Sequence, residues 1–317
     1  MKLNPNGTTV FVFSDPGGAK PCLSLIELNK LTNVVVVSDR KYSFYKDFNV
    51  RVRFLNKGFE KFIDEVQPKL IFTGTSYTSN IEKEFISIAK IKNIPCYSFV
   101  DHWTRISDRF KYRNGKTTLP DKIWVIDERA KQIAIEENIE ENKIVVSGNP
   151  YHSWLKNWKP NISLEDFYRE IKLEDKGRKL LVYAPDPLSN IEGFEKFGFD
   201  ELAATSFLVK LFSENSSDLR DWLVLVKPHP NQDTEKLSKI INQHDMFYML
   251  PGNMNVNLII YYSDLVMGFF SSFLIEADVM GKPVLRFLDK EIKFDPIAEL
   301  RIGRIVSPEE LLLELAQ

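Results

Sequence analysis

The 317-residue chain has little of what marks several large classes of protein. Its only two cysteines, Cys22 and Cys96, fit no metal spacing, and a structural disulfide is not expected in a chain of this size. The formal net charge is −2, whereas general nucleic-acid binders usually show a basic excess. No apolar run approaches the roughly 18 residues of a membrane span, and residues 1–9 lack the apolar core of a signal peptide. We therefore expect a cytoplasmic protein without a nucleic-acid partner, and peripheral association with the inner face of a membrane stays open.

What is present is an alternation of two patterns. Hydrophobic residues make up 44% of the chain and charged residues 27%, which is enough apolar mass for two cores. Short apolar runs alternate with segments of helical periodicity, and this predicts mostly parallel sheets wrapped by helices. We expect two tandem Rossmann-like, doubly wound α/β domains that face a cleft. The predicted parts are an acceptor-side domain at 1–150, a linker at 151–176, a nucleotide-sugar-binding domain at 177–306 and a C-terminal helix at 307–317.

The individual elements follow from the same patterns. Strands are expected at 8–13, 33–38, 51–55, 69–73, 95–100, 122–126 and 143–146, and then at 179–183, 222–226, 246–250, 265–268 and 283–287. Helices are expected at 21–31, 59–67, 81–90, 128–137, 199–213, 234–243, 256–263, 273–280 and 308–316. Ligands of open α/β sheets bind at the carboxyl ends of the strands, so the residues that follow each strand are the candidate site.

The stretch Lys227-Pro-His-Pro follows one of the most apolar strands, at 222–226. Proline has no backbone donor, so the ladder of the sheet must end there. His229 and Pro230 are therefore expected at the carboxyl end of a buried strand, beside Lys227. The alternative is a proline-rich turn with an exposed histidine that has no role.

Ser271 and Ser272 begin a helix directly after the strand at 265–268. Their hydroxyls and the free amides of the helix start would cradle a phosphate. Glu276 lies one turn further along the same face, where it could accept hydrogen bonds from ribose hydroxyls. A serine here could also be only a helix cap. Pro185 and Asp186, after the strand at 179–183, are placed in the same donor-binding set.

In the first half, the strand at 95–100 leads into Asp101-His102-Trp103, with Arg105 close behind. A carboxylate or a histidine at this place could serve as general base for an acceptor hydroxyl. The alternative is a structural Asp-His pair beneath an aromatic ring. Trp103 could equally belong to the core or stack on a sugar.

A second candidate turn follows the strand at 8–13 and holds Asp15, Gly17 and Gly18. Glycines let the backbone come close to a ligand, and the amides at a helix start favour anions. The alternative is a tight strand-to-helix turn. Gly74, at the end of the strand at 69–73, is expected to line the same cleft. Asp15 is an alternative base, and the sequence does not decide between Asp15, Asp101 and His102.

Three motifs in order carry a resemblance to a known family. They are Tyr-Ala-Pro at 183–185, Lys-Pro-His-Pro at 227–230 and Gly-Phe-Phe-Ser-Ser-Phe-Leu-Ile-Glu-Ala at 268–277. Together they resemble the second domain of GT-B glycosyltransferases, above all the bacterial sialyltransferase-like, Kdo-transferase-like and capsule-assembly enzymes that use cytidine-nucleotide donors. They are also similar to the CDP-glycerol glycerophosphotransferases. The resemblance covers roughly the last 140 residues, and the acidic-acidic-glycine motif that carries the base of several sialyltransferase families is not evident.

The resemblance implies an inverting, metal-independent glycosyltransferase. A nonulosonic acid or Kdo would pass from a CMP-linked donor to a hydroxyl of a surface glycan or glycolipid, with no cofactor. His229 and the two serines would hold the donor's phosphate, and Lys227 would help to stabilise it as it departs. Three alternatives stay open: a nucleotide-sugar epimerase or hydrolase of the same fold, a CDP-glycerol-type polyol-phosphate transferase, and a non-catalytic nucleotide-binding subunit of a polysaccharide assembly complex.

Overall fold

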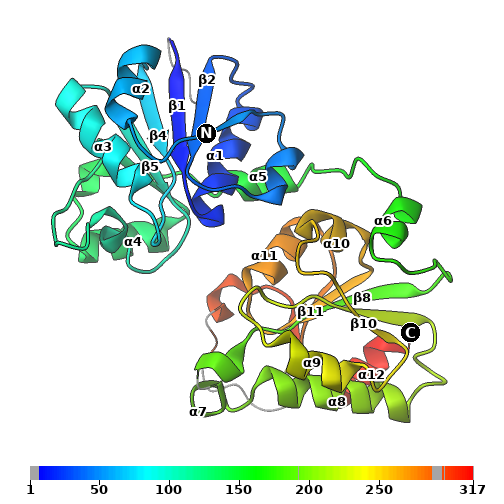
Figure 1. The fold of residues 1–317 in the computed structure, drawn as a ribbon. Helices are drawn as coiled ribbons and strands as arrows, with labels where there is room; N and C mark the ends of the chain where they lie inside the picture. Colours follow the sequence, from blue (N-terminus) through cyan, green and yellow to red (C-terminus); the bar gives the residue numbers. More distant parts are fainter. Residues whose placement is uncertain (1–6, 192, 288–294, 296, 317) are drawn as a thin grey trace. The chain divides into compact units, whose positions relative to one another are not determined.

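The computed structural model of the chain describes residues 7–191, 193–287, 295 and 297–316. The chain divides into two compact units, and the boundary falls between Trp154 and Leu155. Each unit is an α/β domain built on one parallel sheet (Figure 1). The boundary lies within helix α5 (Pro150–Leu155), near the start of the segment 151–176 that we expected as a linker. Most of that segment belongs to the second unit.

The sheet of the first unit has the strand order β3-β2-β1-β4-β5-β6-β7. All neighbouring strands pair in parallel, and β1 lies between β2 and β4 in register Thr9↔Val34 and Thr9↔Leu70. Every residue of β1 is buried, as the unbroken apolar run of a strand covered on both faces requires. The strands are β1 (Thr9–Phe13), β2 (Val34–Ser38), β3 (Val52–Phe54), β4 (Leu70–Thr73), β5 (Cys96–Val100), β6 (Lys122–Val125) and β7 (Ile144–Val146).

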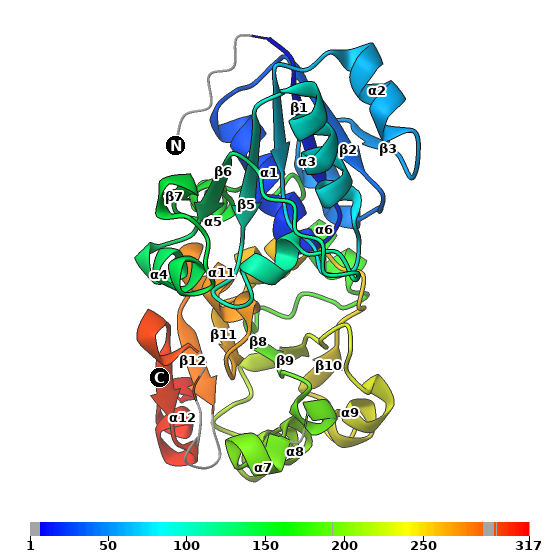
Figure 2. The same ribbon diagram turned by 90° about the vertical axis from the view of Figure 1, so that its left-hand side faces the viewer.

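Helices cover both faces of this sheet. Helix α1 packs on β1, β4 and β5 from one face, while α2, α3 and α4 share a hydrophobic cluster on the other (Figures 1 and 2). This arrangement follows from right-handed crossovers, because the chain first builds the sheet outward from β1 towards β3 and then in the opposite direction from β4. The helices are α1 (Pro16–Leu28), α2 (Phe59–Val66), α3 (Ile81–Lys92) and α4 (Glu128–Glu136).

The second unit repeats the plan, with the order β10-β9-β8-β11-β12-β13 and parallel pairing throughout. Its central strand β8 lies between β9 and β11. The strands are β8 (Lys179–Ala184), β9 (Trp222–Val226), β10 (Phe247–Met249), β11 (Leu265–Gly268), β12 (Val284–Phe287) and β13 (Arg304–Val306). The helices are α6 (Leu164–Glu170), α7 (Gly193–Phe197), α8 (Glu201–Glu214), α9 (Thr234–Ile241), α10 (Val256–Tyr262), α11 (Ser272–Val279) and α12 (Pro308–Leu315).

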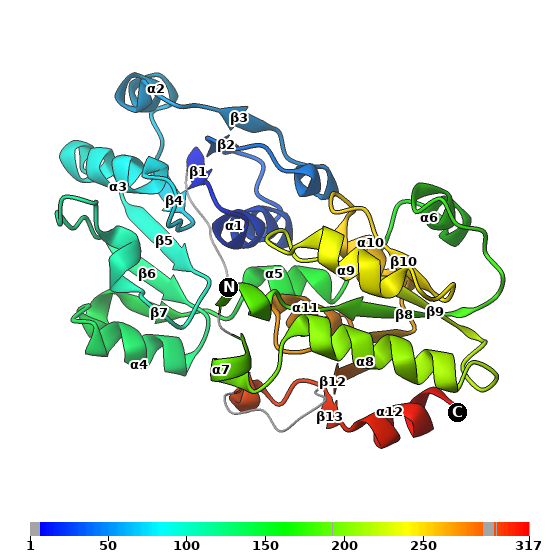
Figure 3. The same ribbon diagram turned by 60° about the horizontal axis from the view of Figure 1, so that its bottom comes forward.

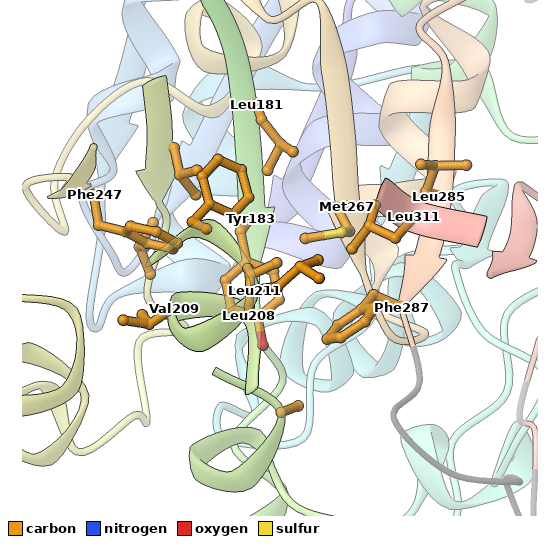
Figure 4. Packing of buried hydrophobic residues seen from close by; sticks show 14 of the residues in the cluster. Leu181, Tyr183, Leu208, Val209, Leu211, Phe247, Met267, Leu285, Phe287 and Leu311 are labelled. Atoms are coloured by element: carbon orange, nitrogen blue, oxygen red, sulfur yellow. The ribbon is translucent and has the colours of Figure 1, made fainter. Parts of the chain in front are cut away.

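Helices α8, α9 and α12 lie on one face of this sheet, and Figure 3 shows them in front of the strands. Their apolar side chains form one cluster with the strands, in which Tyr183 of β8 and Met267 of β11 meet Leu208 of α8 and Leu311 of α12 (Figure 4). On the opposite face α6, α10 and α11 form a second cluster. The indole of Trp222 donates a hydrogen bond of 2.8 Å to the carbonyl of Leu315, which ties α12 to β9.

The elements predicted from the sequence are all present, with small shifts at their ends. The largest shift concerns α1, which we expected to start at Pro21 but which starts at Pro16 and keeps Pro21 inside it. Proline is favoured in the first helical turn. Pro21, five residues later, has no amide hydrogen to donate to the carbonyl of residue 17, and its ring crowds that carbonyl. Strand β13 and helices α5 and α7 were not predicted, because each is short and has no clear periodicity.

Candidate functional site

The strand order of each unit changes direction at one place. In the first unit this is between β1 and β4, and in the second it is between β8 and β11. The loops that leave the carboxyl ends of such a strand pair diverge, so they leave a crevice in which open α/β sheets bind ligands. The two candidate clusters described next lie at these two places, one in each unit.

In the first unit the loops after β1 and β4 touch through their glycines. A Cβ atom on Gly18 would stand 2.8 Å from the amide nitrogen of Thr75, and one on Gly74 would stand 2.6 Å from the Cα of Gly18. At Gly17 an added Cβ would stand 1.9 Å from Oδ2 of Asp101. The three glycines singled out from the sequence are therefore needed for close approach of backbone and carboxylate. They bring Asp101 against the first turn of α1.

Asp15 is held by three donors. Its Oδ1 accepts hydrogen bonds from Nη1 of Arg40 (2.9 Å) and from the hydroxyl of Thr78 (2.7 Å). Its Oδ2 accepts from the backbone amide of Tyr77 (3.0 Å). Asp15 occupies the N-cap position of α1 without capping it through its side chain. Its carboxylate instead joins the loop after β1 to the loop after β4.

Asp101 forms an ion pair with Arg109, with 2.9 Å between Oδ1 and Nη1. The same Nη1 donates to the hydroxyl of Thr75 (3.1 Å), and the guanidinium lies over the ring of Tyr77 at 4.5 Å. Arg109 is almost completely buried, while Asp101 is partly exposed. The carboxylate of Asp101 is thus fixed by a buried cation and keeps access to solvent, which suits a group that exchanges protons with a bound molecule.

His102 is exposed beside this pair. Its Nδ1 lies 3.2 Å from the backbone amide of Thr104, which donates to it. In the neutral ring the hydrogen is therefore on Nε2. Trp103 donates from its indole to Asp127 (2.7 Å) and packs on the core of the unit, which fits the structural alternative stated for it. Arg105 is exposed and has a positive φ of 52°, in the left-handed region.

A buried carboxylate lies beneath these loops. Glu82, in the first turn of α3, is 3% exposed. It accepts hydrogen bonds from the amide of Ser14 (2.9 Å) and the hydroxyl of Ser76 (2.8 Å), one from each loop. Burial raises the pKa of Glu82 to about 7, against the lowering effect of these hydrogen bonds. Sequence reasoning did not single it out, since a glutamate at a helix start is usually exposed.

In the second unit, His229 is held in one tautomer. Its Nδ1 accepts a hydrogen bond from the amide of Asn231 (3.1 Å), so in the neutral ring the hydrogen is on Nε2. Burial, and then the charge of Lys227, lower the pKa of His229 and favour that neutral form. The side-chain oxygen of Gln232 accepts from the amide of His229, while the buried Nε2 of Gln232 has no hydrogen-bond partner among the described residues.

Ser271 is the N-cap residue of α11, yet its hydroxyl makes no capping hydrogen bond. The Oγ atom is buried and has no partner among the residues that the structure describes. Ser272 next to it is exposed and Glu276 is buried in the helix. A cap serine normally satisfies a backbone amide of its helix. The simple capping alternative therefore does not describe Ser271.

Asp186 and Lys227 lie near the same helix start. The amide of Phe270 donates to Oδ2 of Asp186 at 3.2 Å, which links the loop after β8 to the loop after β11. Burial raises the pKa of Asp186 to about 6, partly offset by that hydrogen bond and by Lys227. Nζ of Lys227 lies 5.2 Å from the ring centroid of Phe273, in the first turn of α11. Of the two prolines in the predicted set, Pro185 is buried and Pro230 is exposed.

The structure thus gathers the predicted residues into two clusters, one at each reversal of strand order. Sequence reasoning missed the long-range partners Arg40, Thr75 and Glu82, and also Gln232, which lies three residues after His229. Across the described parts of the chain, no group of three or more His, Cys, Asp or Glu side chains could hold a metal ion. Within the same residues, none of the helices is long and apolar enough to cross a bilayer.

No protein-family model matches this sequence, and no curated protein is similar enough to count as a match. Solved structures are similar in fold over almost the whole chain. UDP-GlcNAc 2-epimerase from Methanocaldococcus jannaschii has a TM-score of 0.67 at 14% identity, over 98% of this chain and 91% of that one. The Neisseria meningitidis UDP-GlcNAc 2-epimerase, bound to UDP-GlcNAc, has a TM-score of 0.63 at 12% identity, over 98% of this chain and 91% of that one. Anabaena HepE, in complex with UDP and glucose, has a TM-score of 0.58 at 13% identity, over 98% of this chain and 89% of that one. The predicted α/β architecture of two Rossmann-like domains, of GT-B-like fold, is confirmed.

Proposed function

We propose that the protein is an enzyme acting on a nucleoside-diphosphate sugar, and that it is a nucleotide-sugar epimerase or hydrolase that needs no separate acceptor. Several similar structures are UDP-GlcNAc 2-epimerases, and two of the three described above hold UDP or UDP-GlcNAc. Epimerases of this fold entered our expectations only as an alternative. They now take precedence over the CMP-dependent transferase, which was the main expectation from the sequence.

The observation that carries the proposal is the hydroxyl of Ser271. It is buried at the start of α11, has no partner among the described residues and does not cap its own helix. Leaving a buried hydroxyl without a hydrogen bond costs about 1–3 kcal/mol. A phosphate oxygen at the helix start would remove that cost and would also interact favourably with the helix dipole.

The neighbouring groups complete an anion site in this proposal. The Nε2–H of neutral His229 and the ammonium of Lys227 would donate to the diphosphate, as would the exposed hydroxyl of Ser272. Glu276 would accept from the ribose, as we expected from the sequence. Pro185, Asp186 and Pro230 would shape the rim of the nucleotide site. Because the first turn of α11 also carries free amides, the leaving diphosphate would be stabilised without a metal.

The first unit would supply proton transfer to the sugar. Asp101 is the proposed general base, because Arg109 fixes its position while its carboxylate stays partly exposed. His102, with its hydrogen on Nε2, would be the second proton-transfer group. Asp15 is assigned to holding the glycine loop, since Arg40, Tyr77 and Thr78 already engage its oxygens.

A second candidate is the transfer of a nonulosonic acid or Kdo from a CMP-linked donor to a glycan or glycolipid. It is favoured by the order of the motifs at 183–185, 227–230 and 268–277 in the sequence. The same phosphate site would serve a nucleoside monophosphate, so the two candidates differ in nucleotide and acceptor rather than in residues.

The two candidates separate in one experiment. The full chain is incubated in D2O with UDP-GlcNAc, or with CMP-sialic acid, and followed by proton and phosphorus NMR. An epimerase converts the UDP-sugar into its epimer with deuterium at the inverted carbon, and a hydrolase releases UDP and free sugar. Either result supports the proposal. Tighter calorimetric binding of CMP than of UDP, with no turnover of any UDP-sugar, overturns it and favours the transferase. If the chain binds a nucleotide but turns over neither sugar nucleotide, with or without added acceptors, the remaining hypothesis is a non-catalytic nucleotide-binding subunit.

A further inference from the structure

A pocket of about 260 Å³ lies in the first unit, next to the cluster around Asp15, with which it shares residues 76–78. It opens between the first turn of α3 and the segment Asp108–Arg113, and residues 76–78 form another part of its wall. Three cationic side chains line it, from Lys83, Lys111 and Arg113, against the one carboxylate of Asp108. The lining is therefore strongly biased towards positive charge, in a protein whose net charge is −2.

Lys83 is the unusual member of this lining. It is only 6% exposed, although lysine is almost never buried without a charged partner. Its ammonium donates to the carbonyl of Lys111 (3.2 Å) and lies 5.6 Å from the ring centroid of Tyr112. Among the described residues no carboxylate lies within ion-pair distance of it. Burial lowers the pKa of Lys83; the charge of nearby Glu82 opposes this shift and that of Arg113 adds to it.

The other two cations, Lys111 and Arg113, differ in whether they form an ion pair. Lys111 pairs with Asp108 at 2.9 Å, so the carboxylate in the lining is used there. Arg113 is exposed and, among the described residues, makes no hydrogen bond or ion pair. Neither the guanidinium nor the buried ammonium therefore has a close ion pair among the described residues, although the charges of Glu82 and Glu84 act on Lys83 from further away. The charge of Arg113 disfavours the charged form of Lys83, and a bound anion would relieve that repulsion.

The pocket also meets the start of α3. The N-cap residue Asn80 lines the pocket and makes no side-chain capping hydrogen bond. The positive end of the helix dipole adds to the field of the two cations. The hydroxyls of Tyr77 and Thr78, in the wall formed by residues 76–78, already donate to the carbonyl of Thr104 and to Asp15. The cations therefore remain as the donors, and a bidentate arginine with a point charge from lysine is a combination that proteins use for phosphate.

We propose that this pocket binds a phosphate group, either free phosphate or the phosphorylated end of a small metabolite, through Lys83 and Arg113. The volume is below that of typical pockets for drug-sized ligands, roughly 300–1,000 Å³, so a whole nucleotide sugar does not fit inside it. The site is distinct from the proposed nucleotide site, which lies in the second unit. Residues 76–78 form its wall and also hold Asp15, so its occupant contacts the loop next to the proposed base.

The test uses the full chain and calorimetry, with inorganic phosphate or glucose 6-phosphate against chloride at equal ionic strength. Arg113→Gln removes an exposed cation and should weaken phosphate binding by about tenfold or more, as expected for losing a charge-assisted contact. Lys116→Gln is the matched control, since Lys116 lies in the same short hairpin but does not line the pocket. It should bind phosphate as the parent does.

Two further variants separate the sites and guard against misfolding. Lys83→Met should abolish binding, and Arg113→Gln keeps the test valid if that buried variant does not fold. Ser271→Ala should retain phosphate binding to the first unit. Tighter binding of inorganic phosphate supports a free-phosphate site, and equal or tighter binding of glucose 6-phosphate supports the phosphorylated end of a metabolite. Unchanged binding in Arg113→Gln, or binding lost only in Ser271→Ala, overturns the proposal.

Discussion

The two strand-end clusters lie at equivalent places in two sheets of similar strand order, but they differ in charge. In the first unit two of the carboxylates are paired with cations of the cluster, Asp15 with Arg40 and Asp101 with Arg109. In the second unit the side chains are mostly donors, with His229 in its Nε2–H form and the hydroxyl of Ser271 without a partner among the described residues. The same scaffold thus provides a fixed carboxylate in one unit and an incomplete anion site in the other. This division matches the proposed roles in proton transfer and nucleotide binding.

The clusters also differ in how their loops are fixed. Contacts between glycines bring the first unit's loops together, and a Cβ on Gly18 or Gly74 would collide with backbone atoms. In the second unit, prolines bracket His229 and a side-chain-to-backbone hydrogen bond from Phe270 to Asp186 joins the loops. The second unit has one comparable backbone contact, because a Cβ on Gly268 would stand 2.6 Å from the carbonyl oxygen of Ala184, but its loops are not joined by a pair of glycines. Four predictions test this comparison.

The largest expected effect is on turnover. Asp101→Asn keeps an acceptor for Arg109 but removes the base, so kcat should fall by about 10²–10⁴-fold while calorimetric affinity for the nucleotide stays unchanged. Rates are measured with the substrate found by NMR. Asp64→Asn, an exposed carboxylate paired with Lys92 in the same unit, is the control. If Asp101→Asn keeps kcat within a few-fold of the parent, Asp101 is not the base, and His102→Ala is then the next variant to measure.

The second prediction concerns Glu82 and pH. Its pKa is about 7 in the folded protein, against an ordinary value of 4.5, so folding favours the protonated form. The contribution to stability is complete below pH 4.5 and is lost as pH rises through 7, by up to roughly 3 kcal/mol. Urea unfolding of the parent should show this decline. Glu82→Gln should remove this decline of stability with pH. Glu84→Gln, two residues further along α3, should show the same decline as the parent. A slope that persists in Glu82→Gln belongs to another group.

The third prediction tests the glycine contacts. In Gly18→Ala the new methyl group meets the backbone of Thr75, which has no flexible end that can move away. The free energy of unfolding should fall by roughly 2 kcal/mol, the usual cost of overpacking. Gly252→Ala is the matched control, because no atom lies within 4 Å of its added Cβ. Equal stability of the two variants would mean that the loops after β1 and β4 are less tightly held than the distances imply.

The smallest effect is expected at Ser271. Ser271→Ala removes a hydroxyl that makes no hydrogen bond to the described residues, so stability should hold or rise slightly. Nucleotide affinity should fall by about tenfold, the effect of one lost hydrogen bond to a charged group. Ser213→Ala, whose hydroxyl bonds only within helix α8, provides the comparison. Reduced stability with unchanged affinity would assign Ser271 a structural role.

The sequence was sufficient to predict where the strands lie and which residues follow them. Apolar runs such as Trp222–Val226 are plain in the sequence, and parallel strands place the residues after them at one edge. Partners from distant elements were beyond it. Glu82 meets Ser14 across 68 residues and Arg40 meets Asp15 across 25, and such contacts depend on the strand order that brings the loops together. The missing hydrogen bond of the Ser271 hydroxyl could not be predicted for another reason. A serine at a helix N-cap looks the same in the sequence whether or not its hydroxyl caps the helix.

The hydrogen bond from Trp222 to Leu315 has a consequence for the order of events during synthesis. The partner lies 93 residues further along the chain, in a helix whose Leu311 and Leu315 complete the cluster around β8 and β9. Until residue 315 has left the ribosome, the part of that face which α12 covers is exposed, although α8 and α9 have already been made. The first unit contains all of its own strands by residue 146 and can fold while the rest is being made. The nascent second unit is therefore the part that chaperones would hold for longest.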